Sequence, residues 1–461
     1  MPNTTTQRKK VSLAEAIWLV GEQLTMARRY LDRPCLRLEI PVLETGLLAW
    51  LNQQQSPVKI YWEDRGSQML VAGLGASDSV TINSGMDYGV FFSKLQTHAA
   101  TGEFPIHYYG GFCFDPGTAR SQEWSGFGQG RFVLPRFELV KTPQGTVFAC
   151  NVLARHLSDD FFQQILDELR NLSGTVAPLP ARLPLPLKRT DIPKQDEWEK
   201  LLRDTLQAIA GGRYQKTVLA RRSTLSFGEN INPVLLLSRL KGVTSNCFFF
   251  LFQFKTGEAF VGASPERLYK RDGLTIETEA VAGTRPVSAS APDDKKFQDD
   301  LLHSPKDRHE QGLVIDMLGE NLPALCDEVS IDPKPSLLHW SGGHHLLTRF
   351  RGRLKNGVAD TDVLAALHPT PAIAGTPTSA AIQEIRRKEP FDRGWYSGPV
   401  GYIGKDRTEF AVAIRSGLIR DTIAHLYAGA GIVQGSVPNM EWDETEYKLK
   451  NFLKIFEPHA R

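Results

Sequence analysis

Two acidic segments in the second half of the chain could hold a divalent cation. In SPKDRHEQGLVIDML, Glu310 lies one helical turn before the apolar residues of one helix face, so we expect it to point inward. In EWDETEYKLKNFLKIF, Glu441 and Glu444 lie one turn apart at the start of an apolar seam. Carboxylates, water and substrate oxygens are the ligands that Mg²⁺ uses. The alternative is that these glutamates are solvated helix charges that pair with Arg308 and Lys448.

Four turn segments rich in small residues could let the backbone approach a ligand closely. They read VGASPERL, AVAGTRPV, HPTPAIAGTP and AGAGIVQGS. Their glycine N–H groups can bind carboxylate oxygens, although each segment alone is a weak signal. GAGIVQG has one residue too many for the dinucleotide-binding fingerprint, and the sequence contains neither a P-loop nor a nucleophile elbow. His339, His344 and His345 lack the spacing and the cysteine partners of a zinc site.

The elements that must position these residues alternate irregularly along the chain. Apolar residues of Gln195–Ala210 recur at helical spacing, and glycines follow at the expected helix end. Strands are expected at Lys216–Leu225 and Cys247–Phe254. Further helices are expected at Lys306–Leu322, Thr361–Leu367, Ser379–Lys388 and Glu441–Phe456. Because helices do not follow every strand, the pattern favours an α+β fold with antiparallel sheets over a doubly wound parallel sheet.

Proline interrupts the chain between Ser173 and Pro193, which predicts an extended connection and the clearest internal boundary. The segment before it contains strand patterns at Val58–Trp62 and Phe132–Phe148, and helical patterns at Leu13–Tyr30 and Asp159–Leu172. We therefore divide the chain into an N-terminal α/β region, residues 1–190, which contributes to a shared core, and a catalytic region, residues 191–461.

Composition excludes several classes of protein. The 461 residues carry 54 Lys and Arg against 52 Asp and Glu, without a basic cluster, which argues against nucleic-acid binding. The longest apolar run, Cys247–Phe254, is too short to cross a bilayer as a helix. The N-terminus lacks the apolar stretch of a secretory signal, and the five cysteines show no metal or disulfide pattern. These features predict a cytoplasmic protein with buried or free thiols.

The sequence as a whole resembles the chorismate-binding enzyme family from Asp196 to Pro458. The segments that carry the resemblance are, in order, YQKTVLARR, FVGASPERL, TEAVAGTRP, SPKDRHE, LHPTPAIAGTP, FDRGWYSGPVGYIG, AIRSGLI and AGAGIVQGSVPNMEWDETEYK. YGGFCFDP, from Tyr109 to Pro116, also resembles the isochorismate synthase branch. The fold that this resemblance implies has two large antiparallel β-sheets packed together, with flanking helices.

The resemblance also implies an activity. Ammonia-using branches of the family carry Gln where this chain has Lys216, and aminodeoxychorismate synthases carry a nucleophilic Lys where it has Ala282. The implied reaction is therefore the Mg²⁺-dependent isomerisation of chorismate to isochorismate, for menaquinone, phylloquinone or salicylate-derived products. Alternatives are a salicylate synthase, which also eliminates pyruvate, and a catalytically silent chorismate-binding subunit. The implied partner is this small molecule, without nucleic acid or membrane, in a monomer or weak homodimer.

Individual roles follow from the family's motifs. The resemblance implies that Lys216 deprotonates the attacking water and that Glu266 protonates the departing hydroxyl. A carboxyl group can do so only if its pKa is raised, and a lysine can act as a base only in its neutral form. Magnesium ligands would be Glu310 and Glu444, with Glu441 and Asp307 binding directly or through water. The implied substrate-binding residues are Gly283, Thr284, His368, Tyr396, Arg415, Gly429 and Gly431.

Overall fold

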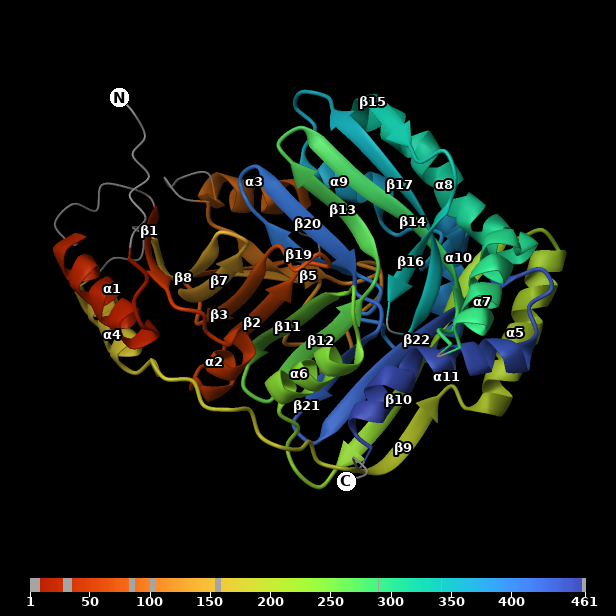
Figure 1. Ribbon diagram of the computed structural model, residues 1–461. Coiled ribbons are helices and arrows are strands. Elements are labelled where there is room, and N and C mark those ends of the chain that lie inside the picture. The colour runs from red at the N-terminus through yellow and green to blue at the C-terminus, as the bar shows by residue number, and fades with distance from the viewer. Residues whose placement is uncertain are drawn as a thin grey trace.

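The computed structural model describes residues 9–27, 35–82, 88–99, 105–153, 159–288, 290–340 and 342–457. Within these ranges the chain forms two large sheets whose paired strands are antiparallel, and helices cover their outer faces and ends (Figure 1). The predicted α+β class with two antiparallel sheets is confirmed. The irregular alternation of elements in the sequence reflects this topology, in which neighbouring strands are joined by hairpins as well as by helices.

The first sheet is the larger one and contains twelve of the described strands. Its order is β1 (Cys35–Val42), β8 (Gly145–Leu153), β7 (Phe137–Thr142), β3 (Leu70–Leu74), β2 (Lys59–Glu63), β11 (Phe248–Lys255), β12 (Glu258–Ser264), β21 (Ser416–Arg420), β22 (Ile423–Val433), β10 (Lys216–Phe227) and β18 (Gly375–Thr376), with β9 (Pro186–Ile192) paired to β10. The predicted strand from Lys216 is thus β10. It pairs with β22 on one side and with β18 and β9 on the other, so Lys216, which lies opposite Val433 and Thr376, begins a strand that is paired on both sides.

The second sheet contains ten of the described strands. Its order is β15 (Cys326–Ile331), β17 (Gly343–Leu354), β14 (Thr275–Arg285), β13 (Arg267–Asp272), β20 (Arg407–Val412), β19 (Pro399–Ile403), β5 (Tyr108–Phe112), β6 (Gly130–Leu134) and β4 (Asp78–Ile82), with β16 (Ser336–Trp340) paired to β17. The short link between β12 and β13 crosses from the first sheet to the second. Glu266 lies on this link.

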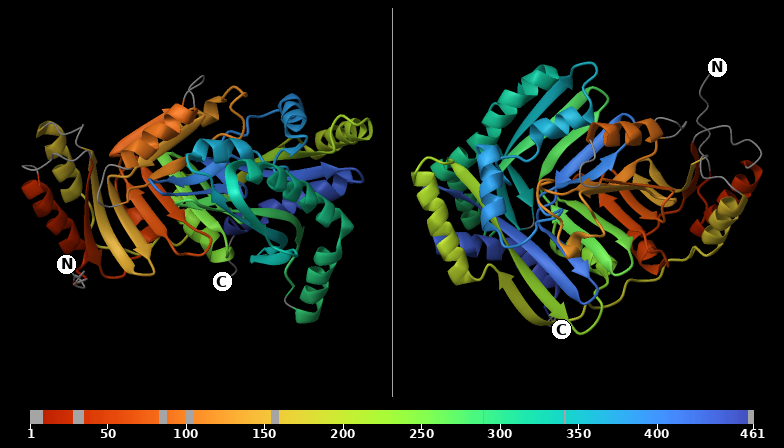
Figure 2. Two further views of the ribbon diagram at one scale, coloured as in Figure 1. Left: turned by 90° about the horizontal axis from the view of Figure 1, so that it is seen from above. Right: turned by 180° about the vertical axis from the view of Figure 1, so that it is seen from behind.

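Eleven α-helices lie in the described ranges. They are α1 (Leu13–Ala27), α2 (Leu47–Gln53), α3 (Tyr88–Ala99), α4 (Asp159–Arg170), α5 (Gln195–Ala210), α6 (Pro233–Val243), α7 (Ala291–His303), α8 (Pro305–Leu325), α9 (Asp360–Leu367), α10 (Thr378–Lys388) and α11 (Pro438–Ile455). Figure 2 shows α1 and α4 together at one end of the molecule. The helices expected at α1, α4, α5, α8, α9, α10 and α11 are present, whereas α2, α3, α6 and α7 lacked a recognised sequence pattern. None of the described helices is long and apolar enough to cross a membrane.

Strands from the beginning of the chain complete both sheets. β2 pairs with β11 in the first sheet, and β5 pairs with β19 in the second. The boundary expected at residues 190/191 falls inside β9, which pairs with β10 of the catalytic region. The division into two regions stays a prediction about the sequence, but hydrogen bonds join the two regions at these three strand pairs.

An aromatic cluster fills the space between the sheets. Phe250 and Phe260 come from the first sheet and Tyr109 and Tyr402 from the second, and all four are buried. Trp395 packs among them, with its ring centroid 6.3 Å from that of Phe260. Buried aromatic side chains contribute large apolar areas and specific edge-to-face contacts. This cluster therefore fixes the spacing of the two sheets, and with it the position of the β12–β13 link.

We predict that Phe260→Ala destabilises the protein by about 3–5 kcal/mol, because the substitution leaves a cavity among rings that cannot close around it. The measurement is urea unfolding followed by tryptophan fluorescence. Trp18→Ala is the matched control, since Trp18 is 62% exposed on α1 and its loss should change stability by less than about 0.5 kcal/mol. Equal effects of the two substitutions would contradict this account of the core.

Candidate active site

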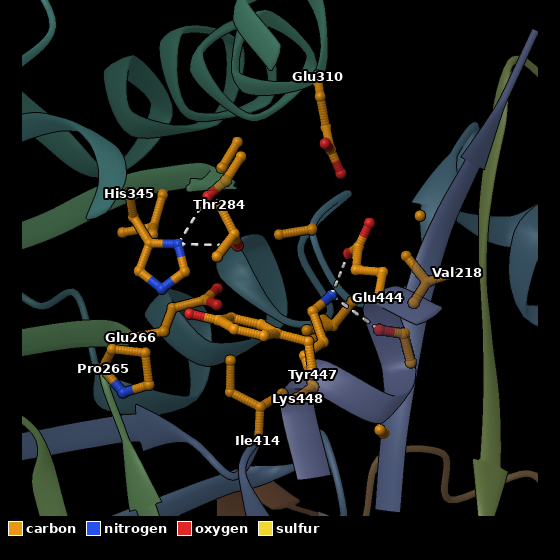
Figure 3. Close-up of a pocket in the computed structure, with 18 of the residues that line it drawn as sticks. Val218, Pro265, Glu266, Thr284, Glu310, His345, Ile414, Glu444, Tyr447 and Lys448 are labelled. Carbon is orange, nitrogen blue, oxygen red and sulfur yellow. Dashed lines mark hydrogen bonds and ion pairs between the residues drawn. The ribbon is translucent and has the colours of Figure 1, made fainter. Parts of the chain in front are cut away.

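A cavity of about 490 Å³ opens beside the β12–β13 link. Its walls come from the ends of β14 and β22, the first turns of α8 and α11, and the segment between β20 and β21. Figure 3 shows Glu310 directed into it from α8 and Glu444 from α11, with Glu266 and His345 on another side. The structure thus brings together most of the residues that the sequence predicted to carry chemistry.

Glu310 lines the cavity and forms an ion pair with Lys216, which is not itself among the lining residues. The Nζ of Lys216 donates to Oε1 of Glu310 at 2.7 Å, and the lysine side chain is completely buried. Ser304 caps α8 by accepting a hydrogen bond from the N–H of Asp307, which fixes the first turn that carries Glu310. A Cβ at position 431 would lie 2.7 Å from that Oε1 and 3.0 Å from Cε of Lys216. Glycine at 431 is therefore required for this pair.

Glu441 and Glu444 project from the first turns of α11. Glu444 accepts from Lys448 at 2.6 Å, and Lys448 also donates to the carbonyl of Gly429 at 2.8 Å. Burial acts to raise the pKa of Glu444, but the Lys448 ammonium lowers it below its ordinary value. Burial and the adjacent Glu444 carboxylate raise the pKa of Glu441, which accepts from Lys306 at 3.3 Å. The α11 turn thus concentrates negative charge at the cavity.

Asp307 lies between the predicted metal site and the turn that begins at Gly283. Its carboxylate accepts from Arg285 at 2.8 Å. Gly283 has a φ of +65°, and a Cβ there would lie 2.8 Å from Oδ1 of Asp307. Only glycine meets both conditions without strain, since other residues rarely adopt this conformation. The AVAGT turn is thus shaped to bring its backbone against the first turn of α8.

The donors at this cavity fit a hard cation in their chemistry. Four carboxylates, Asp307, Glu310, Glu441 and Glu444, line it, and oxygen is the donor that Mg²⁺ prefers. Among the described residues, however, no three such side chains are gathered closely enough to form a metal centre. Each carboxylate instead pairs with a lysine or an arginine, as the previous paragraphs describe. The alternative in which Glu444 pairs with Lys448 is therefore seen in the structure. Glu310, however, pairs with Lys216 and not with Arg308.

Glu266 is buried at the junction of the two sheets. Its N–H donates to Oγ of Ser264 at 3.2 Å, and its carbonyl accepts from the N–H of Val412 at 3.1 Å. Burial raises the pKa of the Glu266 carboxyl to about 7, with Lys216 acting against the rise and Glu279 adding to it. A carboxyl group with this pKa is protonated at mildly acidic pH and can donate a proton near neutrality.

His345 lines the same cavity, although no sequence pattern distinguished it from its histidine neighbours. Its Nδ1 lies 2.6 Å from the carbonyl oxygen of Gly283 and 3.2 Å from Oγ1 of Thr284. Because a carbonyl only accepts, Nδ1 carries the proton. Burial lowers the pKa of His345 to about 3, so the ring is neutral. Its Nε2 is buried without a hydrogen-bond partner, and it is available to accept one from a ligand.

Arg415 and Tyr396 also line the cavity. Arg415 is buried, its guanidinium lies 4.7 Å from the ring centroid of Trp340, and Nη1 is 3.4 Å from the carbonyl of Lys448. Burial lowers its pKa, and it enters none of the ion pairs among the described residues. Tyr396 stacks on Tyr427 with centroids 5.2 Å apart. A buried guanidinium without a carboxylate partner is suited to bind the carboxylate of a ligand.

One expected substrate-binding residue lies elsewhere. His368 caps the C-terminus of α9, its Nε2 is 3.3 Å from the carbonyl oxygen of Phe114, and its ring is edge-on to that phenylalanine. It is not part of the cavity wall. α9 directs His368 toward the GGFCFDP segment, and its expected role in substrate binding stays a prediction. The structure adds His345, Tyr447 and Lys448 to the site, and only the fold brings these three together.

Comparison with known proteins places this cavity in a family. The family model described as chorismate binding enzyme matches residues 22–457. The chain is 32% identical to the isochorismate synthase MenF of Bacillus subtilis, over 86% of this chain and 87% of that protein. It is 35% identical to a chloroplastic isochorismate synthase of Catharanthus roseus, over 77% of this chain and 63% of that protein.

Among solved structures, the fold is similar to that of MenF, the menaquinone-specific isochorismate synthase from Escherichia coli. The TM-score is 0.84 with 28% sequence identity, and the match covers 96% of this chain and all of that one. Family model, relatives and fold agree along nearly the whole length. The chain therefore belongs to the chorismate-binding enzyme family.

Proposed function

We propose that this chain is a magnesium-dependent isochorismate synthase, which adds water at carbon 2 of chorismate while the hydroxyl at carbon 4 leaves. The observation that carries the proposal is a buried, protonatable carboxyl group, Glu266, at the cavity, together with a fully buried lysine, Lys216, which pairs with Glu310 of the cavity wall and acts on the charge of Glu266. The relatives named above carry this activity in their names, and they support its transfer to this chain.

The reaction needs a proton removed from water and a proton given to a hydroxide leaving group. Glu266 supplies the second proton, since burial keeps its carboxyl group protonated up to about pH 7. Lys216 removes the first. His345 accepts a hydrogen bond from a ring hydroxyl at Nε2, which is otherwise unpartnered. Arg415, aided by the Tyr396 hydroxyl, binds a substrate carboxylate in a region from which water is excluded.

Glu310, Glu441 and Glu444 would hold Mg²⁺, with Asp307 reaching it directly or through water. When bound, the ion would neutralise the charge of a substrate carboxylate and so favour the developing negative charge of the reaction. The lysines that pair with these carboxylates, Lys216, Lys306 and Lys448, stabilise their negative charge in the structure described here.

The test of this function is to incubate the purified chain with chorismate and Mg²⁺, with and without a chelator, and to separate the products by chromatography. We expect isochorismate without pyruvate, and only in the presence of the metal. Equal amounts of salicylate and pyruvate would instead identify a salicylate synthase. Binding of chorismate without turnover would identify a silent binding subunit.

We predict that Lys216→Ala and Glu266→Gln each lower kcat by about 100- to 10,000-fold, because each removes a proton-transfer group. Chorismate should still bind, since Arg415 and the cavity backbone are retained. The measurements are turnover and isothermal titration with chorismate. Activity near the wild-type level in both variants would rule out these roles.

We predict that Glu310→Ala raises the Mg²⁺ concentration for half-maximal activity by at least about tenfold, because a direct oxygen ligand is lost. Thermal stabilisation by Mg²⁺ gives a second readout that does not depend on turnover. Glu320→Ala is the control, since Glu320 is exposed on the same helix, away from the cavity. Identical Mg²⁺ titrations for both variants would argue against the ligand role.

We predict that kcat/KM falls as pH rises through about 7, because the raised pKa of Glu266 means that its carboxyl group loses its proton there. Below this value the acid is protonated and this limb of the profile is flat. The measurement is the pH–rate profile at saturating Mg²⁺. A profile without an alkaline limb between pH 6 and 9 would exclude Glu266 as the titrating acid.

A further inference from the structure

We propose that Arg65, in the turn between β2 and β3, is a positioning residue for Glu266, so that the first region of the chain takes part in the reaction. Arg65 does not line the cavity; it acts on the residue that precedes the acid. This role rests on the proposed function, since it assumes that Glu266 is the proton donor.

Arg65 makes contacts that no other residue of its turn makes. Its Nη1 donates to the carbonyl oxygen of Pro265 at 2.8 Å and to Oε2 of Glu279 at 2.8 Å. Its Nη2 donates to Oε1 of the same carboxylate at 2.5 Å. The side chains are 9% and 1% exposed. A bidentate guanidinium–carboxylate pair is strong and geometrically specific, and here it is removed from water.

The residue that follows the acid is held in a similar way. Arg267 donates to Glu279 at 3.1 Å and to Glu409 at 3.0 Å. The guanidinium groups of Arg65 and Arg267 each lie 5.7 Å from the ring centroid of Phe248. The residues on both sides of Glu266 are therefore held to the same buried carboxylate, Glu279. On one side the contact is made by Arg65, which lies 200 residues earlier in the chain than Pro265.

Four charged groups act on the Glu266 carboxyl group from the elements around it. Lys216 on β10 and Lys448 on α11 favour its ionised form, whereas Glu279 on β14 and Glu310 on α8 disfavour it. Arg65 neutralises one of the two negative groups, Glu279, and holds the backbone carbonyl next to the acid. Its removal has two consequences: the acid is displaced, and Glu279, which keeps only its ion pair with Arg267, acts on the acid more strongly because its charge is less fully compensated.

The test is Arg65→Met in the full chain, compared with Arg65→Lys. We expect kcat to fall about 10- to 100-fold in the methionine variant, because displacing a catalytic group by about 1 Å has costs of this size. KM for chorismate should stay within about twofold, since Arg65 does not touch the cavity. The alkaline limb of the pH profile should move to higher pH. Arg65→Lys, which keeps the charge, should recover part of kcat and return the limb toward that of the wild type.

Glu279→Gln provides a second and opposite readout if the methionine variant folds poorly. It removes the negative charge while Arg65 remains on Pro265, so the alkaline limb should move to lower pH. Arg37→Met is the matched control. Arg37 forms a similarly buried pair with Glu138, distant in the fold on β1 and β7, so its loss should lower stability but leave kcat and the pH profile unchanged.

The outcomes separate this role from the proposed function. Wild-type turnover together with unchanged kcat and pH profile in Arg65→Met would overturn the positioning role alone. The same conclusion follows if Arg65→Met and Arg37→Met lose stability and activity in parallel, with no shift of the limb in Arg65→Met or Glu279→Gln. If the wild-type chain does not convert chorismate at all, the proposed function fails, and the role of Arg65 fails with it.

Discussion

Most of the charged side chains at the cavity are partly or wholly shielded from water, and they recover the lost hydration through partners of opposite charge. Lys216 recovers it from Glu310, and Lys448 from Glu444 and the Gly429 carbonyl. These pairs require helices α8 and α11 to begin at the cavity and glycine to leave space beside β22. The arrangement of the two helices and two sheets around the cavity thus depends on pairing a few buried charges.

Two groups at the cavity lack such a partner, and they are therefore able to bind a ligand. Arg415 enters none of the ion pairs among the described residues, and Nε2 of His345 accepts no hydrogen bond. Glu266 is intermediate: it faces both positive and negative groups, and burial decides its protonation. The cavity therefore offers a carboxylate-binding group, a hydrogen-bond acceptor and an acid, held in place by neighbours that are already paired.

The first region of the chain is part of this arrangement. β2 and β5 extend the two sheets, and the aromatic cluster between the sheets joins residues from both regions. Arg65, also from the first region, holds the backbone carbonyl of Pro265 beside Glu266. The catalytic residues lie in the second half of the sequence, but the frame that sets their positions uses the whole chain.

The sequence by itself determined the family, the α+β class and the carboxylates that line the cavity, because ordered motifs and helical or alternating periodicity are local properties that can be read without a structure. Tertiary structure decided the rest. It placed His368 against Phe114 and brought His345 to the cavity, and it paired Glu310 with Lys216 and not with Arg308. It also brought Arg65 to Pro265. Which side chains meet across two sheets depends on strand order and packing between segments hundreds of residues apart, and no local pattern encodes that.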